Sequence, residues 1–251
     1  MKAMIFAAGL GTRLKPFTLS HPKALVTVGG VPMLGRVIAS LRRQGITEIV
    51  VNVHHFADQI VNYLRTGDFG VDIRISDESE MLLDTGGGVL KAAPMLRGND
   101  PILLYNADIL CNIDLGDMLR HHRTTGADVT LLAQKRDTSR HLCFDNATGR
   151  LAGWVNTTTG ESRPKEFIPS DMLTGLAFGG IHIISQKVLD ALAVYPDAPK
   201  FSLTPFYVDN CSELDIRAYT PHNDIQWFDI GKPETLEKAR SYVDSTSGIV
   251  I

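Results

Sequence analysis

A short segment near the N-terminus contains the first residues whose types and spacing could do chemistry. Ala8, Gly9 and Gly11 stand where an apolar run ends, and Thr12 and Arg13 follow them. Small residues let the backbone approach a ligand closely and turn its amide groups toward it, which suits a polyphosphate. We predict that these five residues bind a triphosphate.

Two basic residues flank the same anion site. Arg13 offers a rigid fork of donors to phosphate oxygens, and Lys23, in a Pro-Lys-Ala-Leu run, offers a compact point charge that could reach a reacting phosphorus. Positive charge placed where negative charge develops stabilises a transition state. We therefore predict catalytic roles for Arg13 and Lys23.

Two aspartates end apolar runs, where a carboxylate can face a crevice. Asp108 closes the run that begins at Leu104, and Asp229 follows Trp227 and Phe228. Either aspartate alone would as readily cap a turn. Because Mg²⁺ prefers a few carboxylates together with phosphate oxygens and water, the pair beside a phosphate loop predicts a magnesium site formed by Asp108 and Asp229.

The elements that must position these residues alternate between buried strands and helices. Leu34, Val37, Ile38 and Leu41 lie on one face of the first expected helix, after the turn at 29–30. Strands are expected at 3–8, 48–53, 71–76, 102–106 and 128–134, and further helices at 56–64, from 88 to 96 and from 114. This alternation predicts a Rossmann-like α/β fold, a mostly parallel sheet with helices on both faces and ligands at the carboxyl ends of its strands.

The chain is expected to form one domain, 1–251, in which the pattern changes twice. Residues 1–135 form the alternating core, 136–225 form an insertion that closes over the crevice, and 226–251 bring a return strand and a C-terminal helix.

Composition narrows the class of protein. The formal net charge of −3 argues against a broad nucleic-acid surface, and no uncharged stretch approaches the length of a membrane span. The three scattered cysteines show neither zinc spacing nor a disulfide framework. We expect a cytoplasmic protein, a monomer or homodimer, that binds small molecules and neither nucleic acid nor membranes.

Two common nucleotide-binding motifs do not fit the same residues. A dinucleotide fold requires a third glycine where Leu14 stands, and an acidic residue at the end of the second strand, where the run 51–53 has none. A Walker loop requires Ser or Thr after Gly-Lys, but Pro233 follows Lys232. Neither motif is predicted.

The spacing Ala-Gly-x-Gly-x-Arg-Leu-x-Pro, followed by Pro-Lys-x-Leu, resembles the nucleoside-diphosphate-sugar pyrophosphorylase (sugar nucleotidylyltransferase) family over nearly the whole chain. The resemblance implies a glycosyltransferase-A-like nucleotidyltransferase fold and an enzyme that joins a nucleoside triphosphate to a sugar 1-phosphate with release of pyrophosphate. It also implies that Asp108 and Asp229 bind the catalytic Mg²⁺. Ala107 departs from the glycine usual before the first aspartate.

Three glycines are expected at the base. Gly86, Gly87 and Gly88 could bond a planar base edge through exposed amides, although a flexible turn is the alternative, and the apolar 81–83 run before them forms either a lip over the base or core. The triple glycine resembles the branch of the family that activates N-acetylmuramate 1-phosphate with UTP, which implies cell-wall precursor recycling.

On the acceptor side, the run 174–181 resembles the family strand that lines the sugar pocket. We expect sugar contacts for Gly179 and Gly180 of this run, in the 136–225 part, and for Asn106 of the core. The usual Glu-Lys-Pro element is missing, which is consistent with an acceptor bulkier than glucose. Glucose 1-phosphate uridylyl- or thymidylyltransferase, mannose 1-phosphate guanylyltransferase and a non-catalytic nucleotide-sugar sensor remain open as alternatives.

Two pairs of adjacent histidines, 54–55 and 121–122, invite a metal interpretation. Neighbouring residues diverge on a strand or a helix, so a pair cannot grip one ion. We expect these histidines at the surface or at edges of the fold.

Overall fold

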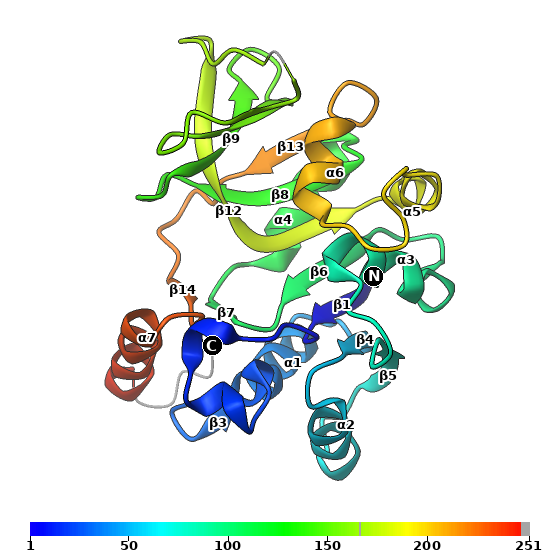
Figure 1. The fold of residues 1–251 in the computed structure, drawn as a ribbon, viewed down its shortest axis with the longest axis vertical. Coiled ribbons are helices and arrows are strands. Elements are labelled where there is room, and N and C mark those ends of the chain that lie inside the picture. The colour runs from blue at the N-terminus through cyan, green and yellow to red at the C-terminus, as the bar shows by residue number, and fades with distance from the viewer. Residues whose placement is uncertain (166, 247–251) are drawn as a thin grey trace.

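The structure, a computed structural model, describes residues 1–165 and 167–246 (Figure 1). The strands of its main sheet are β1 (Lys2–Phe6), β4 (Glu48–Val53), β5 (Asp72–Asp77), β6 (Ile102–Asn106), β8 (Val129–Gln134), β9 (Arg140–Asp145), β10 (Leu151–Asn156), β11 (Ser162–Arg163), β12 (Leu173–Ile184) and β13 (Ile216–Tyr219). The helices are α1 (Met33–Arg43), α2 (Ala57–Thr66), α3 (Asp84–Leu96), α4 (Leu115–Thr125), α5 (Gln186–Ala193), α6 (Leu203–Asp209) and α7 (Pro233–Ser245).

The ten strands follow the order β11-β10-β9-β12-β6-β1-β4-β5, with β8 beside β12 and β13 beside β8. β1, β4, β5 and β6 run parallel to one another, whereas β12 runs antiparallel to β6, β8 and β9. The predicted α/β fold with a mostly parallel core is confirmed. The long β12 carries the sheet onward into the lobe made by β9, β10 and β11 (Figure 1).

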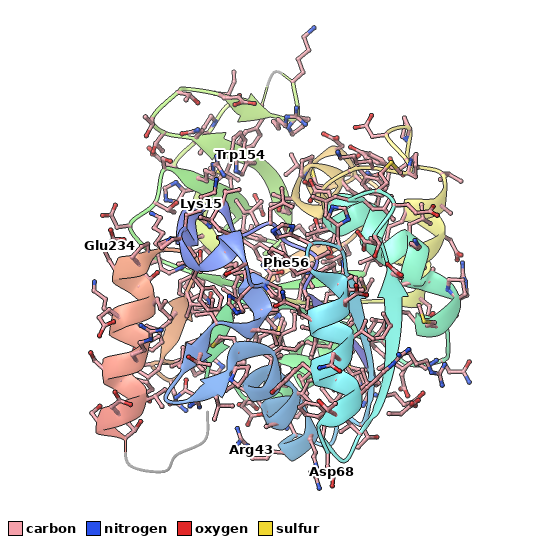
Figure 2. The ribbon with its side chains drawn as sticks, turned by 60° about the horizontal axis from the view of Figure 1, so that its bottom comes forward. Lys15, Arg43, Phe56, Asp68, Trp154 and Glu234 are labelled. Atoms are coloured by element: carbon pink, nitrogen blue, oxygen red, sulfur yellow. The ribbon has the colours of Figure 1, made fainter. Side chains whose placement is uncertain are left out.

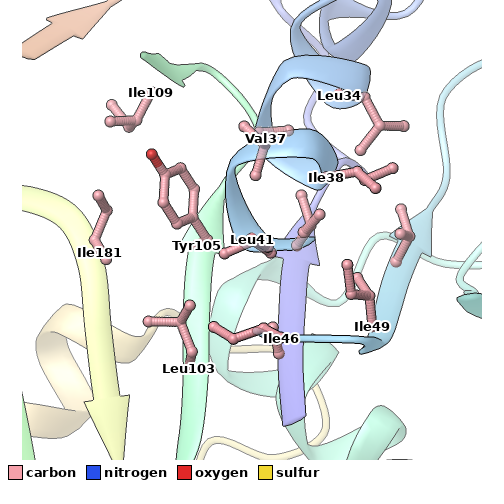
Figure 3. Close-up of a cluster of buried hydrophobic side chains, with 14 of the residues drawn as sticks. Leu34, Val37, Ile38, Leu41, Ile46, Ile49, Leu103, Tyr105, Ile109 and Ile181 are labelled. Atoms are coloured by element: carbon pink, nitrogen blue, oxygen red, sulfur yellow. The ribbon is translucent and has the colours of Figure 1, made fainter. Parts of the chain in front are cut away.

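Helices cover both faces of the sheet, and each face has its own cluster of buried apolar residues. On one face α1, α2 and α4 pack on β1, β4 and β6, and the four apolar residues of α1 at helical spacing are all buried. In Figure 3, Val37 and Leu41 lie toward Tyr105, and Leu34 and Ile38 lie toward β4. On the other face α3, α5 and α6 enclose a second cluster that includes Met4, Leu104 and Phe206. Burial of these two clusters stabilises the central strands whose ends form the site.

A third cluster attaches the last described helix to the first residues of the chain. Leu14, Val26, Leu110 and Ile230 are buried together with Ala239 of α7. Two small sheets support this packing, β2 (Thr27–Val28) with β3 (Val31–Pro32) and β7 (Ile109–Cys111) with β14 (Trp227–Asp229). Figure 2 shows Lys15 of the N-terminal segment and Glu234 at the start of α7.

Three expectations about elements need correction. The first strand ends at Phe6 and not at residue 8, so Ala7 and Ala8 already belong to the loop. The glycines 86–88 lie inside the first turn of α3, which begins at Asp84, and not in a turn before it. The stretch 185–226 contains α5, α6 and β13, which the pattern did not predict. No helix within the described residues is both long and apolar enough to cross a membrane.

Candidate active site

A cavity of about 420 Å³ opens at the carboxyl ends of β1 and β6, where a parallel sheet is expected to bind its ligand. The predicted residues that line it are Ala8, Gly9, Gly11, Thr12, Arg13, Lys23, Asn106 and Asp108. The other lining residues are Phe6, Ala7, Leu10, Ala24, Asn52, Leu82, Asp84, Thr85, Ala107 and Gly231. The structure thus brings the N-terminal loop and the Asn106–Asp108 segment to one hollow.

The N-terminal loop has a defined shape. The Ala7 amide donates to Asn52 Oδ1 at 2.8 Å, which fixes where the loop leaves β1. Gly11 has a φ of 63°, and a Cβ there would stand 2.8 Å from Thr18 Cγ2 and 2.9 Å from Lys23 Cβ. A glycine is therefore required at position 11, both for its left-handed backbone and for the close approach of the Lys23 segment.

Lys23 forms an ion pair with Asp108. Its Nζ donates to Asp108 Oδ2, and the two side chains are only 13% and 22% exposed. Coulomb interactions are stronger in such a partly dehydrated position than in water. The carboxylate therefore holds the ammonium group at the cavity wall.

Gly231 marks the point where the charged groups converge. A Cβ added at Gly231 would stand 2.7 Å from Lys23 Nζ, 2.8 Å from Arg13 Nη2 and 2.8 Å from Asp229 Oδ1. The Gly231 amide also donates to Asp229 Oδ1 at 2.8 Å. Two cations and a carboxylate thus surround one small volume that only a glycine leaves open.

The pairing of β7 with β14 brings the two aspartates together. Asp229 lies opposite Ile109 in that pair, and the Ile230 amide donates to the Asp108 carbonyl at 3.0 Å. Asp108 and Asp229 are therefore neighbours across two antiparallel strands, although far apart in sequence. Sequence patterns predicted each residue, and the strand pairing explains why they share a site.

The residues present fit a Mg²⁺ ion. Among the described residues, only one oxygen of each aspartate is occupied, Oδ2 of Asp108 by Lys23 and Oδ1 of Asp229 by Gly231. No group of three or more His, Cys, Asp or Glu side chains that could hold a metal occurs in the described residues. Two hard carboxylates with free oxygens suit an ion that takes most of its ligands from phosphates and water.

The three glycines expected at the base lie beneath the cavity wall. The amides of Gly86 and Gly87 both donate to the Phe201 carbonyl, at 2.8 and 3.2 Å. A Cβ at Gly87 would stand 2.0 Å from the Pro199 carbonyl oxygen. Gly86 and Gly87 allow α3 to touch the 199–201 segment, and their amides are already paired with a backbone carbonyl.

The cavity wall at this end comes from Leu82, Asp84 and Thr85 instead. Leu82 thus matches the lip alternative for the apolar run, whereas Leu83 is buried as core.

Sequence reasoning missed a buried polar network behind this wall. Glu78 is fully buried, and its carboxylate accepts from Asn52 Nδ2 at 2.7 Å and from the Leu83 amide at 3.1 Å. Since Asn52 also binds the Ala7 amide, the network links the N-terminal loop to the start of α3. Glu78 stands in a polar Ser-Asp-Glu-Ser-Glu run that gives no sign of burial, which only the alignment of β5 beside β4 reveals.

The two acceptor-side glycines form a bulge in β12. The register of β12 against β8 shifts between Phe178 and His182, and Gly180 has a φ of 74°. A Cβ at Gly180 would stand 2.9 Å from Asn106 Nδ2, so this glycine lies directly behind a cavity-lining residue. Gly179 and Gly180 do not line the cavity themselves.

One histidine differs from its predicted place at the surface. His122 is 3% exposed, and its Nδ1 lies 2.9 Å from Thr130 Oγ1. Burial lowers the pKa of His122 to about 4, the nearby Asp128 opposing this effect, so the ring is neutral at pH 7. The surface prediction is wrong for His122 because α4 packs it against β8.

The fold and this cavity define an α/β protein with a ligand-sized cavity at the loop that follows the first strand. Residues 2–246 match the family described as Nucleotidyl transferase. The chain belongs to this family, which confirms the resemblance at the level of the family.

Two curated relatives are mannose-1-phosphate guanyltransferases. The chain is 30% identical over 242 residues to the one from Debaryomyces hansenii and 28% identical over 241 residues to the one from Schizosaccharomyces pombe, with 93% of this chain covered in both cases. The matches span 62% of each relative, so the chain covers about three fifths of their length. Neither relative is named for N-acetylmuramate.

Solved structures agree on the fold. HddC from Yersinia pseudotuberculosis, complexed with GMP-PN, superposes with a TM-score of 0.74 at 23% identity, covering 96% of this chain and 99% of that one. A UDP-glucose pyrophosphorylase complexed with UDP-glucose gives a TM-score of 0.78 at 16% identity, with 98% of both chains covered. At these identities the likeness concerns the fold alone.

Proposed function

We propose that this protein is a sugar-1-phosphate nucleotidyltransferase, which joins a nucleoside triphosphate to a sugar 1-phosphate and releases pyrophosphate. The observation that carries the proposal is the convergence of Arg13, Lys23 and Asp229 on Gly231, with Asp108 paired to Lys23. A cavity with two cations beside two carboxylates suits the meeting of two phosphorylated substrates.

The reaction needs no general base from the protein. A phosphate monoester has its second pKa near ~6 and is largely a dianion at neutral pH. Its oxygen attacks the α-phosphorus, a new P–O bond forms, and the bond to the bridging oxygen of pyrophosphate breaks. The barrier comes from repulsion between two anions, so alignment and positive charge do the work.

Each charged residue has a proposed role. Arg13 grips the β- and γ-phosphates through its planar fork, and Lys23, fixed by Asp108, neutralises charge at the reacting phosphate. Asp108 and Asp229 would hold Mg²⁺ through their free oxygens. When bound, Mg²⁺ supplies further positive charge to the phosphate oxygens.

Two substrate pairs are proposed, each on a different observation. The relatives named mannose-1-phosphate guanyltransferase favour GTP with mannose 1-phosphate. The triple glycine 86–88, as a motif that resembles the N-acetylmuramate branch, and the missing Glu-Lys-Pro element favour UTP with N-acetylmuramate 1-phosphate, and hence a place in cell-wall precursor recycling. The same proposal divides the chain into a nucleotide-binding part, 1–135, a sugar-binding part, 136–225, and a return segment, 226–251. It also includes a cytoplasmic location and a monomeric or homodimeric state.

The test is pyrophosphate release over a grid of substrates. Purified protein with Mg²⁺ is given GTP, UTP, dTTP, ATP or CTP in combination with mannose, glucose, N-acetylglucosamine or N-acetylmuramate 1-phosphate. We expect release that needs both the sugar phosphate and the metal. Nucleotide binding without release for any pair would instead indicate a non-catalytic sensor and would refute the proposal.

A further inference from the structure

Arg136 stands just past the end of β8 and is held in place by two contacts. Its Nη2 donates to the Phe178 carbonyl, and its Cζ lies 3.7 Å from the centre of the Trp227 ring. The ring is fixed in turn, because Trp227 Nε1 donates to the Gly179 carbonyl at 2.8 Å. The guanidinium plane therefore has one orientation.

This fixed charge interacts with Asp229 at a distance and forms no close ion pair. Within 1–165 and 167–246, no carboxylate lies within ion-pair distance of Arg136, and its Nε is buried without any hydrogen bond. Burial lowers the pKa of the guanidinium, while the charge of Asp229 opposes this change. A partly dehydrated cation without a close counter-ion is unfavourable unless a ligand supplies the negative charge.

Arg136 lies beside β14, the strand that carries Asp229. Trp227 and Asp229 are two residues apart on β14, so their side chains lie on one face about 7 Å apart. The β12 bulge connects the same place to Asn106, since Gly180 touches Asn106 and the adjacent Gly179 binds Trp227. Arg136 therefore lies close to Asp229 and to the bulge behind Asn106, where the acceptor is expected to bind, and just outside the residues that line the cavity.

We propose that Arg136 binds an anionic group of the acceptor and thereby selects it. The inference rests on the proposed function, because the acceptor is taken to be a sugar phosphate. A guanidinium fork presents paired donors that match two oxygens of a carboxylate or a phosphate. Two sources fit this chemistry, the 1-phosphate itself and a carboxylate carried on the sugar ring.

Binding can be measured without turnover through the fluorescence of Trp227. The chain has two tryptophans, so Trp154→Phe leaves Trp227 as the only reporter; Trp154 lies in the β9–β11 lobe (Figure 2). The probes are mannose 1-phosphate, N-acetylmuramate 1-phosphate, free N-acetylmuramate and free mannose. They separate the phosphate from the carboxylate, and free mannose carries neither.

The variants are Arg136→Gln, which removes the charge, and Arg136→Lys, which keeps the charge and loses the fork. Arg140→Gln is the matched control, since Arg140 is exposed at the start of β9. If Arg136 binds the phosphate, Arg136→Gln raises the dissociation constants of both sugar phosphates roughly 10- to 100-fold. If Arg136 binds the carboxylate, Arg136→Gln raises only the dissociation constants of the two N-acetylmuramate probes. Arg136→Lys should fall between.

The inference is overturned if no anionic probe changes the Trp227 signal, or if Arg136→Gln leaves every dissociation constant as in Arg140→Gln. A kinetic measurement on the active pair adds a second readout: the KM of the acceptor should rise while the KM of the nucleotide stays constant. Failure of the proposed function would appear differently, as absence of pyrophosphate release with Arg136-dependent anion binding retained.

Discussion

Gly231→Ala should separate catalysis from stability. The new methyl group would stand 2.7 Å from Lys23 Nζ and 2.8 Å from both Arg13 Nη2 and Asp229 Oδ1, whereas ordinary contacts begin at 3.4 Å. The ends of the Lys23 and Arg13 side chains must therefore move away by roughly 0.6 Å, which costs little stability because both side chains are flexible. The rate is more sensitive, since a displacement of about 1 Å in a site can cost 10²-fold. Gly231 has no left-handed φ, so alanine imposes no backbone strain.

We expect kcat/KM for pyrophosphate release to fall roughly 10- to 100-fold and the free energy of unfolding to change by less than about 1 kcal/mol. Gly98→Ala is the control, because a Cβ there meets no atom within 4 Å. Activity and urea unfolding are measured on both variants. Unchanged activity in Gly231→Ala, or a loss explained by unfolding, would refute the placement of the three charged groups around this residue.

Three further predictions follow from the same geometry. Lys23→Ala or Asp108→Asn should lower turnover roughly 10²- to 10³-fold, the scale for losing one preorganised charged group, and wild-type turnover in both variants would contradict the catalytic assignment. Glu78→Gln places an amide donor against Asn52 Nδ2 or the Leu83 amide; it should reduce the free energy of unfolding by about 1 to 3 kcal/mol and raise the KM for nucleotide, whereas equal urea midpoints would argue against the buried network. The pKa of His122 is about 4 in the folded protein, below its ordinary value of 6.5. Between these two values the unfolded chain binds a proton at His122, whereas the folded protein keeps the ring neutral. Stability should therefore fall as the pH drops from about 6.5 toward 4, by about 2 kcal/mol between pH 7 and pH 5 from this residue. His122→Gln should show a smaller loss over that interval in urea unfolding, and an equal loss would contradict the burial.

Much of the fold could be predicted because its signals are local. The apolar spacing in α1 and the buried runs of β1, β4 and β6 follow from periodicity, and they suffice for a mostly parallel sheet with helices on both faces. The small residues at 8–13 predicted a ligand loop because they are also a local signal: a backbone that approaches a ligand closely needs residues with small side chains.

Other features depend on pairing between segments that are distant in sequence, and no local pattern predicts them. β7 and β14 have three residues each, too few for a period, yet their pairing places Asp229 beside Asp108. The sequence around Glu78 is polar and gives no sign of burial, whereas in the fold its carboxylate accepts hydrogen bonds from Asn52 of the neighbouring strand and from the Leu83 amide. The glycines 86–88 were expected under a base, but a glycine serves equally where two backbones touch, and sequence alone does not separate these uses.

The docking of α7 on the N-terminal segment has a consequence for the order of events during synthesis. A ribosome releases Arg13 about two hundred residues before Asp229. Arg13 and Lys23 thus emerge long before Asp229, the carboxylate that meets them at Gly231. Translation itself delays completion of this group of charges until the strand that carries Asp229 has joined β7.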